Sequence, residues 1–267
     1  MEDGIIYWNV DPTIFWITNS FSIRYYGLCW VLALALGYYI VKRIYINEKT
    51  PLEELETLTL YIILGTFLGA RLGHCFFYEP AYYFENITEV LLPIKKVGAS
   101  YKFYGFRGLA SHGAVLGVFI AIAIYAKKNK IQILWLLDRV AIGSTVTAAF
   151  IRIGNLMNSE IYGKPTNGNW GVVFERNDLI PRHPTQIYEA VSYLLIFGVL
   201  MFIYNRKNYD RKNGILFILL FSARFIIEFF KENQMGFEDS LALNMGQILS
   251  IPIIITGVVF LFAKRSI

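Results

Sequence analysis

The chain is organised around one stretch of sequence, Ile151-Arg152-Ile153-Gly154-Asn155-Leu156-Met157-Asn158-Ser159-Glu160-Ile161-Tyr162-Gly163. It follows a long apolar run, yet it carries a full positive charge, two carboxamides and a carboxylate. Ionisable groups at membrane depth are costly and usually face a protein interior or a wet cavity. Arginine stays charged and donates two parallel hydrogen bonds, so we interpret Arg152 as a ligand of a lipid phosphate. An ion pair of Arg152 with Glu160 or Glu189 is the structural alternative, and both roles are compatible.

The composition around this stretch indicates an integral membrane protein. Hydrophobic residues make up 55% of the 267 residues, and the mean hydropathy is +0.45. The net charge of +5 is compatible with nucleic-acid binding, but the basic residues lie beside the ends of apolar runs. We therefore attribute them to membrane orientation and expect no nucleic-acid partner. Cys29 and Cys75 lie within apolar runs and are predicted to be buried thiols.

Seven apolar runs approach the roughly 20 residues that a membrane-spanning helix needs. We predict an all-α polytopic membrane protein with spans at residues 23–45, 58–77, 109–126, 133–156, 187–204, 214–230 and 246–262. Residues 1–267 would form a single integral membrane domain. Residues 79–108 and 158–185 would form a small extracytoplasmic head, with a short strand expected at residues 170–174.

Charges at the ends of these runs alternate along the chain. Basic clusters follow the first, third, fifth and seventh runs: Lys42-Arg43, Lys127-Lys128 with Lys130, Arg206-Lys207 with Arg211-Lys212, and Lys264-Arg265. Acidic residues occupy the other ends: Glu2, Asp3, Asp11, Glu232, Glu238 and Asp239. Because cytoplasmic loops carry an excess of Lys and Arg, this pattern predicts an N-terminus outside and a C-terminus in the cytoplasm.

Three further polar groups interrupt the apolar runs. Arg71 and His74 are three residues apart and share one helical face; a backbone-bonded or snorkelling arginine is the structural alternative. His112 is either a general base, a phosphate donor or a core residue. Arg224 and Glu228 have i,i+4 spacing, which predicts an intrahelical ion pair, structural or functional.

Glycines at four-residue spacing form a ridge on the second span, at Gly65, Gly69 and Gly73. Gly113 and Gly117 have the same four-residue spacing on the third span. Small residues let membrane helices approach closely, so we predict a packing role. The sequence contains no Gly-x-Ser-x-Gly elbow, Walker A loop or His-Glu-x-x-His motif. The three histidines are scattered, so no metal site is expected.

The stretch from Arg152 to Gly163 closely resembles the signature of bacterial prolipoprotein diacylglyceryl transferases. Further matches follow the family order: Tyr25-Tyr26-Gly27-Leu28, Gly69-Ala70-Arg71-Leu72-Gly73, Ser111-His112-Gly113, Arg182-His183-Pro184-Thr185-Gln186-Ile187-Tyr188-Glu189, Arg224-Phe225-Ile226-Ile227-Glu228-Phe229-Phe230 and Met245-Gly246-Gln247-Ile248-Leu249-Ser250. Two positions depart from the family pattern, at Ala114 and in the segment before His112. The resemblance covers nearly the whole chain.

The resemblance implies transfer of the diacylglyceryl group of phosphatidylglycerol to a cysteine thiol. That cysteine lies in the lipobox of a prolipoprotein signal peptide, and the products are a thioether-linked precursor and glycerol phosphate. No cofactor is implied, and the expected location is the bacterial cytoplasmic (inner) membrane, in contact with membrane lipid.

We assign roles to individual residues on this basis. Arg152 and Arg224 would bind the phosphate, and His112 is a candidate base; neighbouring arginines that lower the thiol pKa are the alternative. The residues expected to bind or orient the lipid are Arg152, Tyr26, Asn155, Asn158, Glu160, Gly163, His183, Glu189 and Glu228. A lipid transporter without chemistry and a structural assembly subunit remain alternative functions.

Overall fold

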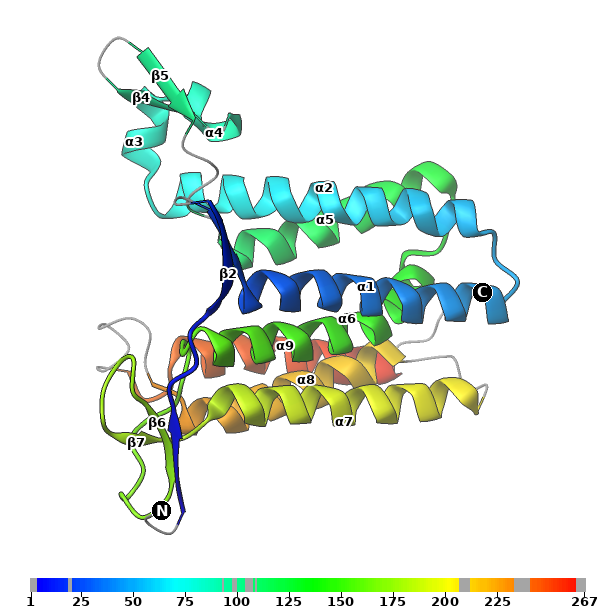
Figure 1. Ribbon diagram of the computed structural model, residues 1–267. Helices are drawn as coiled ribbons and strands as arrows, with labels where there is room; N and C mark the ends of the chain where they lie inside the picture. The colour runs from blue at the N-terminus through cyan, green and yellow to red at the C-terminus, as the bar shows by residue number, and fades with distance from the viewer. Residues whose placement is uncertain are drawn as a thin grey trace. The chain divides into compact units, whose positions relative to one another are not determined.

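A helix forms at each of the seven apolar runs (Figure 1). These helices are α1 Tyr25–Asn47, α2 Leu52–Phe77, α5 Ser111–Asn129, α6 Ile133–Met157, α7 Thr185–Asn205, α8 Lys212–Ile227 and α9 Met245–Phe262. The computed structural model describes residues 4–18, 21–92, 94–97, 100–103, 108, 110–206, 212–232 and 241–262. Helix α2 begins six residues before the predicted start at 58, because Glu53 and Glu54 in its first turn favour a helix N-terminus.

Within the described residues, five of these helices are long and apolar enough to cross a membrane: α1, α2, α6, α7 and α9. Helix α8 has 16 residues and is followed directly by a 3-10 turn, η1, at Glu228–Phe230. Many large apolar side chains are exposed along the helices, as expected where lipid rather than water surrounds them. The protein is therefore a helical, polytopic membrane protein.

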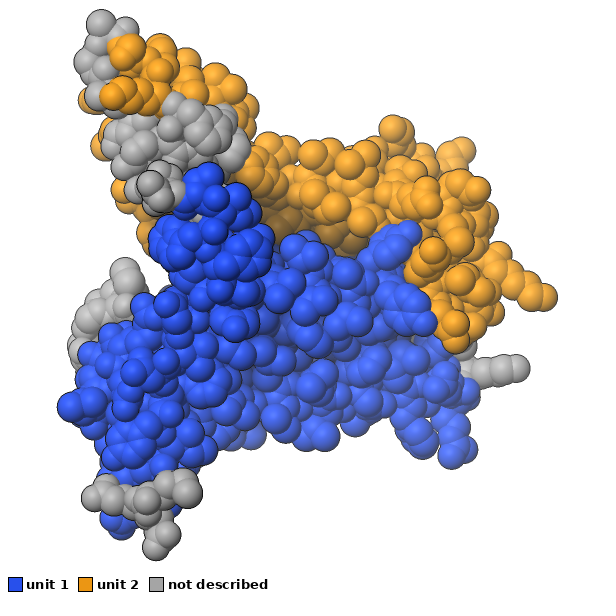
Figure 2. Space-filling model, viewed as in Figure 1, with its two compact units in different colours: residues 1–41, 138–267 blue, residues 42–137 orange. Residues whose placement is uncertain are grey.

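The chain divides into two compact units, residues 1–41 with 138–267 and residues 42–137 (Figure 2). In the first unit, α7 packs on α8 and α8 packs on α9. Helices α1 and α6 are joined where the Thr147 hydroxyl donates to the carbonyl of Ala33, 3.0 Å away. Ala33, Ala149 and Leu200 lie in its core with no exposed surface.

The first unit also carries small sheets, of which the sequence predicted one strand and not the pairing. Strand β1 (Ile5–Trp8) pairs in parallel with β6 (Gly171–Phe174), and β6 pairs antiparallel with β7 (Pro181–Arg182). A hairpin of β2 (Thr13–Thr18) and β3 (Phe21–Arg24) leads into α1. Strand β6 confirms the strand predicted within 170–174.

In the second unit, α2 packs along α5 over the predicted glycine ridge. A Cβ added at Gly69 or Gly117 would collide with the backbone of the opposite helix, so the two helices touch through their glycines. This confirms the packing prediction. Two short helices, α3 (Pro80–Glu85) and α4 (Thr88–Leu91), and a hairpin of β4 (Ile94–Val97) and β5 (Ser100–Phe103) follow α2.

Candidate functional site

Arg152 lies near the end of α6 and points toward α7, where Glu189 meets it. The Nε of Arg152 is 2.8 Å from Oε2 of Glu189, whose side chain is 1% exposed. Nη1 of Arg152 donates to Oδ1 of Asn155, 3.2 Å away on the next turn of α6. The carboxylate and the amide hold the guanidinium in one orientation, which is the ion pair that the sequence offered as an alternative.

A tight turn after α6 brings Glu160 back onto the helix end. Nδ2 of Asn155 donates to Oε1 of Glu160 at 2.7 Å, and Nδ2 of Asn158 donates to the same oxygen at 3.4 Å. Ser159 and Ile161 both have positive φ, 53° and 58°. Left-handed backbone is strained for a β-branched residue such as Ile161, and such strain gathers at functional sites.

A chain of alternating charges continues from Glu189 toward α8. Nζ of Lys231 is 3.3 Å from Oε1 of Glu189 and 3.3 Å from Oε1 of Glu228. Nη2 of Arg224 is 3.5 Å from the same Glu228 oxygen, which confirms the predicted i,i+4 pair. Asn244 donates to Oε2 of Glu228 at 3.2 Å. Arg152 and Arg224 are thus linked through two carboxylates and one lysine.

This charge cluster, defined as Arg152, Glu189, Lys231, Glu228 and Arg224, contains three cations and two anions. Its formal charge is therefore +1 when all five groups are ionised. Tyr193 of α7 donates to Oε1 of Glu189 at 3.4 Å, and both arginines act electrostatically on its hydroxyl. A buried cluster with one surplus positive charge can accept a singly charged anion such as a phosphodiester.

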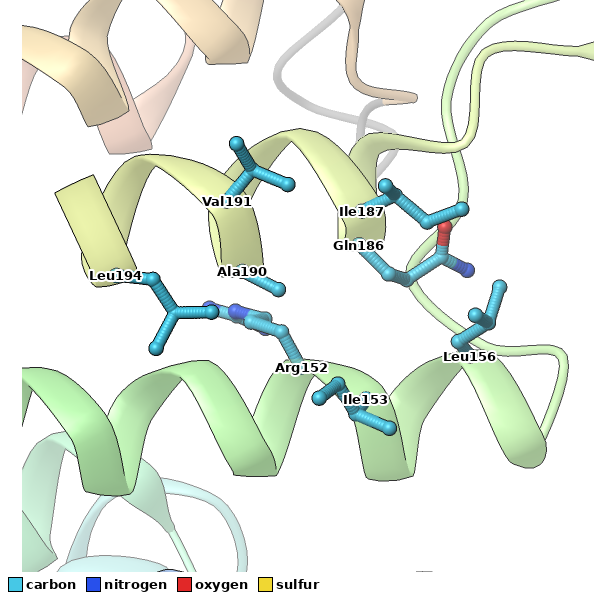
Figure 3. A pocket seen from close by; sticks show the side chains of 8 residues that line it. All are labelled: Arg152, Ile153, Leu156, Gln186, Ile187, Ala190, Val191 and Leu194. Carbon is cyan, nitrogen blue, oxygen red and sulfur yellow. The ribbon is translucent and has the colours of Figure 1, made fainter.

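A pocket of about 200 Å³ opens beside Arg152, between α6 and α7 (Figure 3). Arg152 and Gln186 are the polar residues of its wall, and the remaining lining is Ile153, Leu156, Ile187, Ala190, Val191 and Leu194. Ile187, Val191 and Leu194 are also exposed on the outer surface of α7. The pocket therefore presents an apolar surface next to Arg152 and opens toward the exposed face of α7.

A second ion-pair group lies where β7 leads into α7. Nη2 of Arg182 is 2.6 Å from Asp178, and Nη1 is 2.7 Å from Glu232. The hydrogen bond from Arg182 holds the pKa of the Asp178 carboxyl below its usual value. Nη1 of Arg182 also donates to the carbonyl of Gly163, 3.4 Å away. Arg182 thus fastens the segment that follows the Arg152 turn.

His183 and Gly163 lie together at this junction. The backbone N–H of Gly163 donates to the carbonyl of His183 at 2.8 Å, and a Cβ at Gly163 would collide with His183 and Phe230. The His183 ring contacts Trp170, with centroids 4.9 Å apart, and its Nδ1 is 3.2 Å from the Tyr188 hydroxyl. Burial lowers the pKa of His183, so the imidazole is neutral at pH 7.

Three other predicted residues lie elsewhere or outside the described side chains. Tyr26 packs against Gly154, which is 200° around the helix from Arg152 by the helical repeat of 100° per residue, so it approaches α6 from another face. The side chain of His112 lies outside the part of the chain that is described. Arg71 donates to the carbonyls of Glu89, Val90 and Gly108, at 2.5, 2.8 and 3.3 Å, which supports its structural interpretation.

The sequence interpretation missed two members of the site. Lys231 is 2% exposed and bridges both glutamates, yet it directly follows the Arg224–Phe230 motif and received no role from the sequence. Its i+3 spacing from Glu228 was the available signal. Gln186 was noted within a motif but received no role, although it is fully buried beside Arg152.

Comparisons with known proteins agree with one another. The family model of prolipoprotein diacylglyceryl transferase matches residues 12–263. A phosphatidylglycerol–prolipoprotein diacylglyceryl transferase of Bacteroides fragilis is 46% identical over 98% of this chain and 97% of its own. Proteins of the same name from Chloroherpeton thalassium and Tolumonas auensis are 43% and 41% identical, over 96% and 98% of this chain and 93% and 98% of their own.

Proposed function

The chain belongs to the prolipoprotein diacylglyceryl transferase family, and from that premise we propose that Arg152 and Arg224 bind the phosphate of its lipid substrate. The enzyme transfers the diacylglyceryl group of phosphatidylglycerol to prolipoprotein, the activity that gives its relatives their name. The observation that carries the proposal is the pocket beside Arg152, next to a buried charge cluster with a surplus of one positive charge.

The chemistry explains why cations are needed. A thiolate of the lipobox cysteine attacks the glycerol carbon that bears the phosphate ester, a C–S bond forms and the C–O bond breaks. The electron pair leaves on the phosphate oxygen, so negative charge grows on the glycerol phosphate in the transition state. Fixed cations in a site of low dielectric stabilise that charge more than the ground state.

The thiol must lose its proton before attack, because the thiolate is the nucleophile. His112 is the proposed acceptor of that proton, as the family motif suggests. Lowering of the thiol pKa by the arginines is the second route. Asn155, Asn158, Glu160 and Glu189 support the arginine, and we assign Gly163, His183 and Glu228 to the surrounding wall. Tyr26, which the sequence placed in the same cavity, packs instead against Gly154 on another face of α6.

We place the enzyme in the bacterial cytoplasmic membrane with seven spans, its N-terminus outside. Helices at all seven predicted runs support this count, since α5 has 19 residues and α8 continues into η1. Residues 79–108 and 158–185 would face the outside, where a secreted prolipoprotein presents its lipobox. The pocket between α6 and α7 would take the lipid laterally from the bilayer.

Mass spectrometry of a lipobox peptide tests this function. The peptide is incubated with the purified full-length protein and vesicles containing phosphatidylglycerol. We expect a mass gain of one diacylglyceryl unit on the cysteine, with release of glycerol phosphate. Movement of lipid across the vesicle membrane without a covalent product would instead indicate a transporter, and neither product nor movement would indicate a structural subunit.

A further inference from the structure

The turn after α6 follows a pattern that usually ends a helix on glycine. The N–H of Ser159 donates to the carbonyl of Leu156 at 3.0 Å. The N–H of Glu160 donates to the carbonyl of Asn155, also at 3.0 Å. This pair of bonds is the Schellman motif, in which the left-handed residue is usually glycine, whereas here it is Ser159 with φ of 53°. The motif folds Glu160 back along α6 toward Asn155.

A second left-handed residue follows, and its side chain is β-branched. Ile161 has φ of 58°. In this region the side chain of an L-residue crowds its own backbone, and a branched one does so most. A backbone strained in this way persists only where the surrounding structure holds it. Groups outside the turn must therefore keep it in place.

The first two residues of α7 hold this turn by its carbonyls. Oγ1 of Thr185 donates to the carbonyl of Ile161 at 3.0 Å, and Nε2 of Gln186 donates to that of Glu160 at 2.8 Å. The carbonyl before these accepts from Nδ2 of Asn177 at 2.6 Å. Thr185 and Gln186 have no exposed surface, so water does not compete for their hydrogen bonds. Both bonds cross from α7 to the turn and fasten its strained part.

The turn reaches Arg152 through two side chains. Oε1 of Glu160 accepts from Nδ2 of Asn155 at 2.7 Å. Oδ1 of the same amide accepts from Nη1 of Arg152 at 3.2 Å. Because the amide of Asn155 donates at one end and accepts at the other, a displaced Glu160 would shift it and weaken its bond to the guanidinium. The conformation of the turn therefore bears on the orientation of Arg152.

We propose that Thr185 and Gln186 are positioning residues for the transfer reaction. They keep the turn left-handed, and the turn keeps Glu160 and Asn155 where they orient Arg152. The inference rests on the proposed phosphate-binding role of Arg152. A fixed orientation of the cation matters most when charge develops in the transition state, so its loss should lower kcat more than it raises KM.

Replacement of Thr185 tests the inference. Thr185→Val removes the hydroxyl and keeps a branched side chain of similar size. For the purified full-length enzyme, we expect kcat for transfer from phosphatidylglycerol to a lipobox peptide to fall by roughly ten- to 100-fold, with KM nearly unchanged, as after a small misplacement of a reacting group. Thr185→Ser keeps the hydroxyl and should keep most of the activity. If Thr185→Val does not fold, Gln186→Met, which removes the donor to Glu160, should show the same loss of kcat.

Thr147 of α6 provides the matched control. Its hydroxyl also donates to a carbonyl of another segment, that of Ala33 in α1, at 3.0 Å. Thr147→Val should keep the wild-type kcat, whatever its effect on thermal stability, because this bond lies away from the turn.

Relief of the backbone strain gives a second control. Glycine adopts positive φ about as readily as negative φ, so the turn in an Ile161→Gly enzyme needs less support. Adding Thr185→Val to Ile161→Gly should therefore lower kcat much less than Thr185→Val does in the wild-type enzyme.

Two results would overturn the inference. One is an equal effect of Thr185→Val and Thr147→Val on kcat. The other is a loss from Thr185→Val that is just as large in the Ile161→Gly enzyme, because the hydroxyl would then act by a route other than the strained turn. Near-normal turnover by folded Arg152→Ala would instead refute the proposed phosphate-binding role.

Discussion

The guanidinium of Arg152 is held by protein groups before any lipid arrives. Glu189 and Asn155 fix its Nε and Nη1, at 2.8 and 3.2 Å, and the Arg152 side chain is also part of the pocket wall. A charge held in place needs no reorganisation when negative charge develops beside it, which is the source of its catalytic effect. The ion pair and the phosphate-binding role are therefore complementary.

Replacement of Arg152 should remove most of the transfer activity. We expect Arg152→Ala to lower kcat/KM by roughly 100- to 1,000-fold, the usual effect of deleting a donor that stabilises transition-state charge. Arg152→Lys should also be impaired by at least about tenfold, because an ammonium cannot make the two parallel bonds of a guanidinium. The measurement is the rate of diacylglyceryl transfer to a lipobox peptide by purified variants.

Arg176 is a suitable control for this experiment. Its side chain is 41% exposed and its Nη1 is 3.7 Å from Asp11, an exposed ion pair of the kind that contributes little. Arg176→Ala should retain wild-type turnover. Near-normal turnover by folded Arg152→Ala would show that the phosphate is bound elsewhere.

Lys231 neutralises two buried carboxylates and should matter for stability. Lys231→Met keeps the length of the side chain but leaves Glu189 and Glu228 without the cation between them. Removing one partner of a buried ion pair typically costs about 3–5 kcal/mol, so thermal unfolding in detergent should shift clearly downward. Adding Glu228→Gln should restore part of the loss, because without Lys231 the carboxylate of Glu228 keeps only the more distant, one-third exposed Arg224 as its ion-pair partner among the described residues.

The comparison for Lys231 is Lys164, which is exposed and whose ammonium donates to the carbonyl of Phe229 at 3.1 Å. Lys164→Met should unfold at nearly the wild-type temperature. An equally small shift for Lys231→Met would contradict the prediction and mean that Arg152 and Arg224 alone compensate the two glutamates.

At the scale of helices, α2 and α5 approach through glycine faces. A Cβ at Gly117 would fall on the carbonyl oxygen of Gly65, and one at Gly65 would lie 2.6 Å from the carbonyl oxygen of Gly117. Backbone cannot yield as a flexible side chain does, so even one methyl group must push the helices apart. We expect Gly117→Ala to lower the unfolding free energy by about 1–3 kcal/mol, measured by thermal unfolding in detergent.

Gly198 in α7 provides a control in which glycine-to-alanine substitution should stabilise the protein rather than destabilise it. No atom lies within 4 Å of a Cβ built there. Gly198→Ala should stabilise the protein slightly, by about 0.5–1 kcal/mol, because alanine has the higher helix propensity. Equal effects of the two substitutions would contradict the close glycine contact.

Local sequence patterns predicted the positions of the helices but could not predict which strands pair with each other. Apolar runs and glycine spacing depend only on neighbouring residues, and both agree with the structure. Strand β1 is different, because its partner β6 lies in a distant segment and four residues of pattern cannot identify it. The start of α2 was placed too late because charged residues that favour a helix start are not apolar.

The site shows the same division. Arg152, Asn155 and Glu160 are close in sequence, and the structure brings them together as helical spacing predicts. Lys231 and Gln186 join them only because α7 packs on α8 and its Glu189 reaches Arg152 of α6. From the sequence alone, a lysine at the end of a hydrophobic run is interpreted as an interfacial residue whose ammonium reaches water. Only the structure shows that the ammonium of Lys231 lies between two buried carboxylates.

For the whole molecule, the alternation of charge along the chain predicts which ends face the cytoplasm. Basic clusters after alternate runs agree with seven spans, whereas an even number would divide them between two sides. The proposed reaction depends on this arrangement, because the turn that follows Arg152 must face the side on which prolipoproteins present their cysteine.

Cysteine labelling in intact cells tests the topology. In a background of Cys29→Ala and Cys75→Ala, single cysteines replace Asn167, in the segment after α6, and Lys130, at the C-terminal end of α5; both positions are exposed. A membrane-impermeant maleimide should label the Asn167→Cys protein in intact cells. The Lys130→Cys protein should react only after the membrane is opened, since seven spans place it in the cytoplasm. Labelling of both proteins in intact cells would rule out a membrane span between positions 130 and 167. Labelling of the Lys130→Cys protein alone would mean that the orientation is inverted. The turn after Arg152 would then lie on the opposite side of the membrane from its proposed substrate.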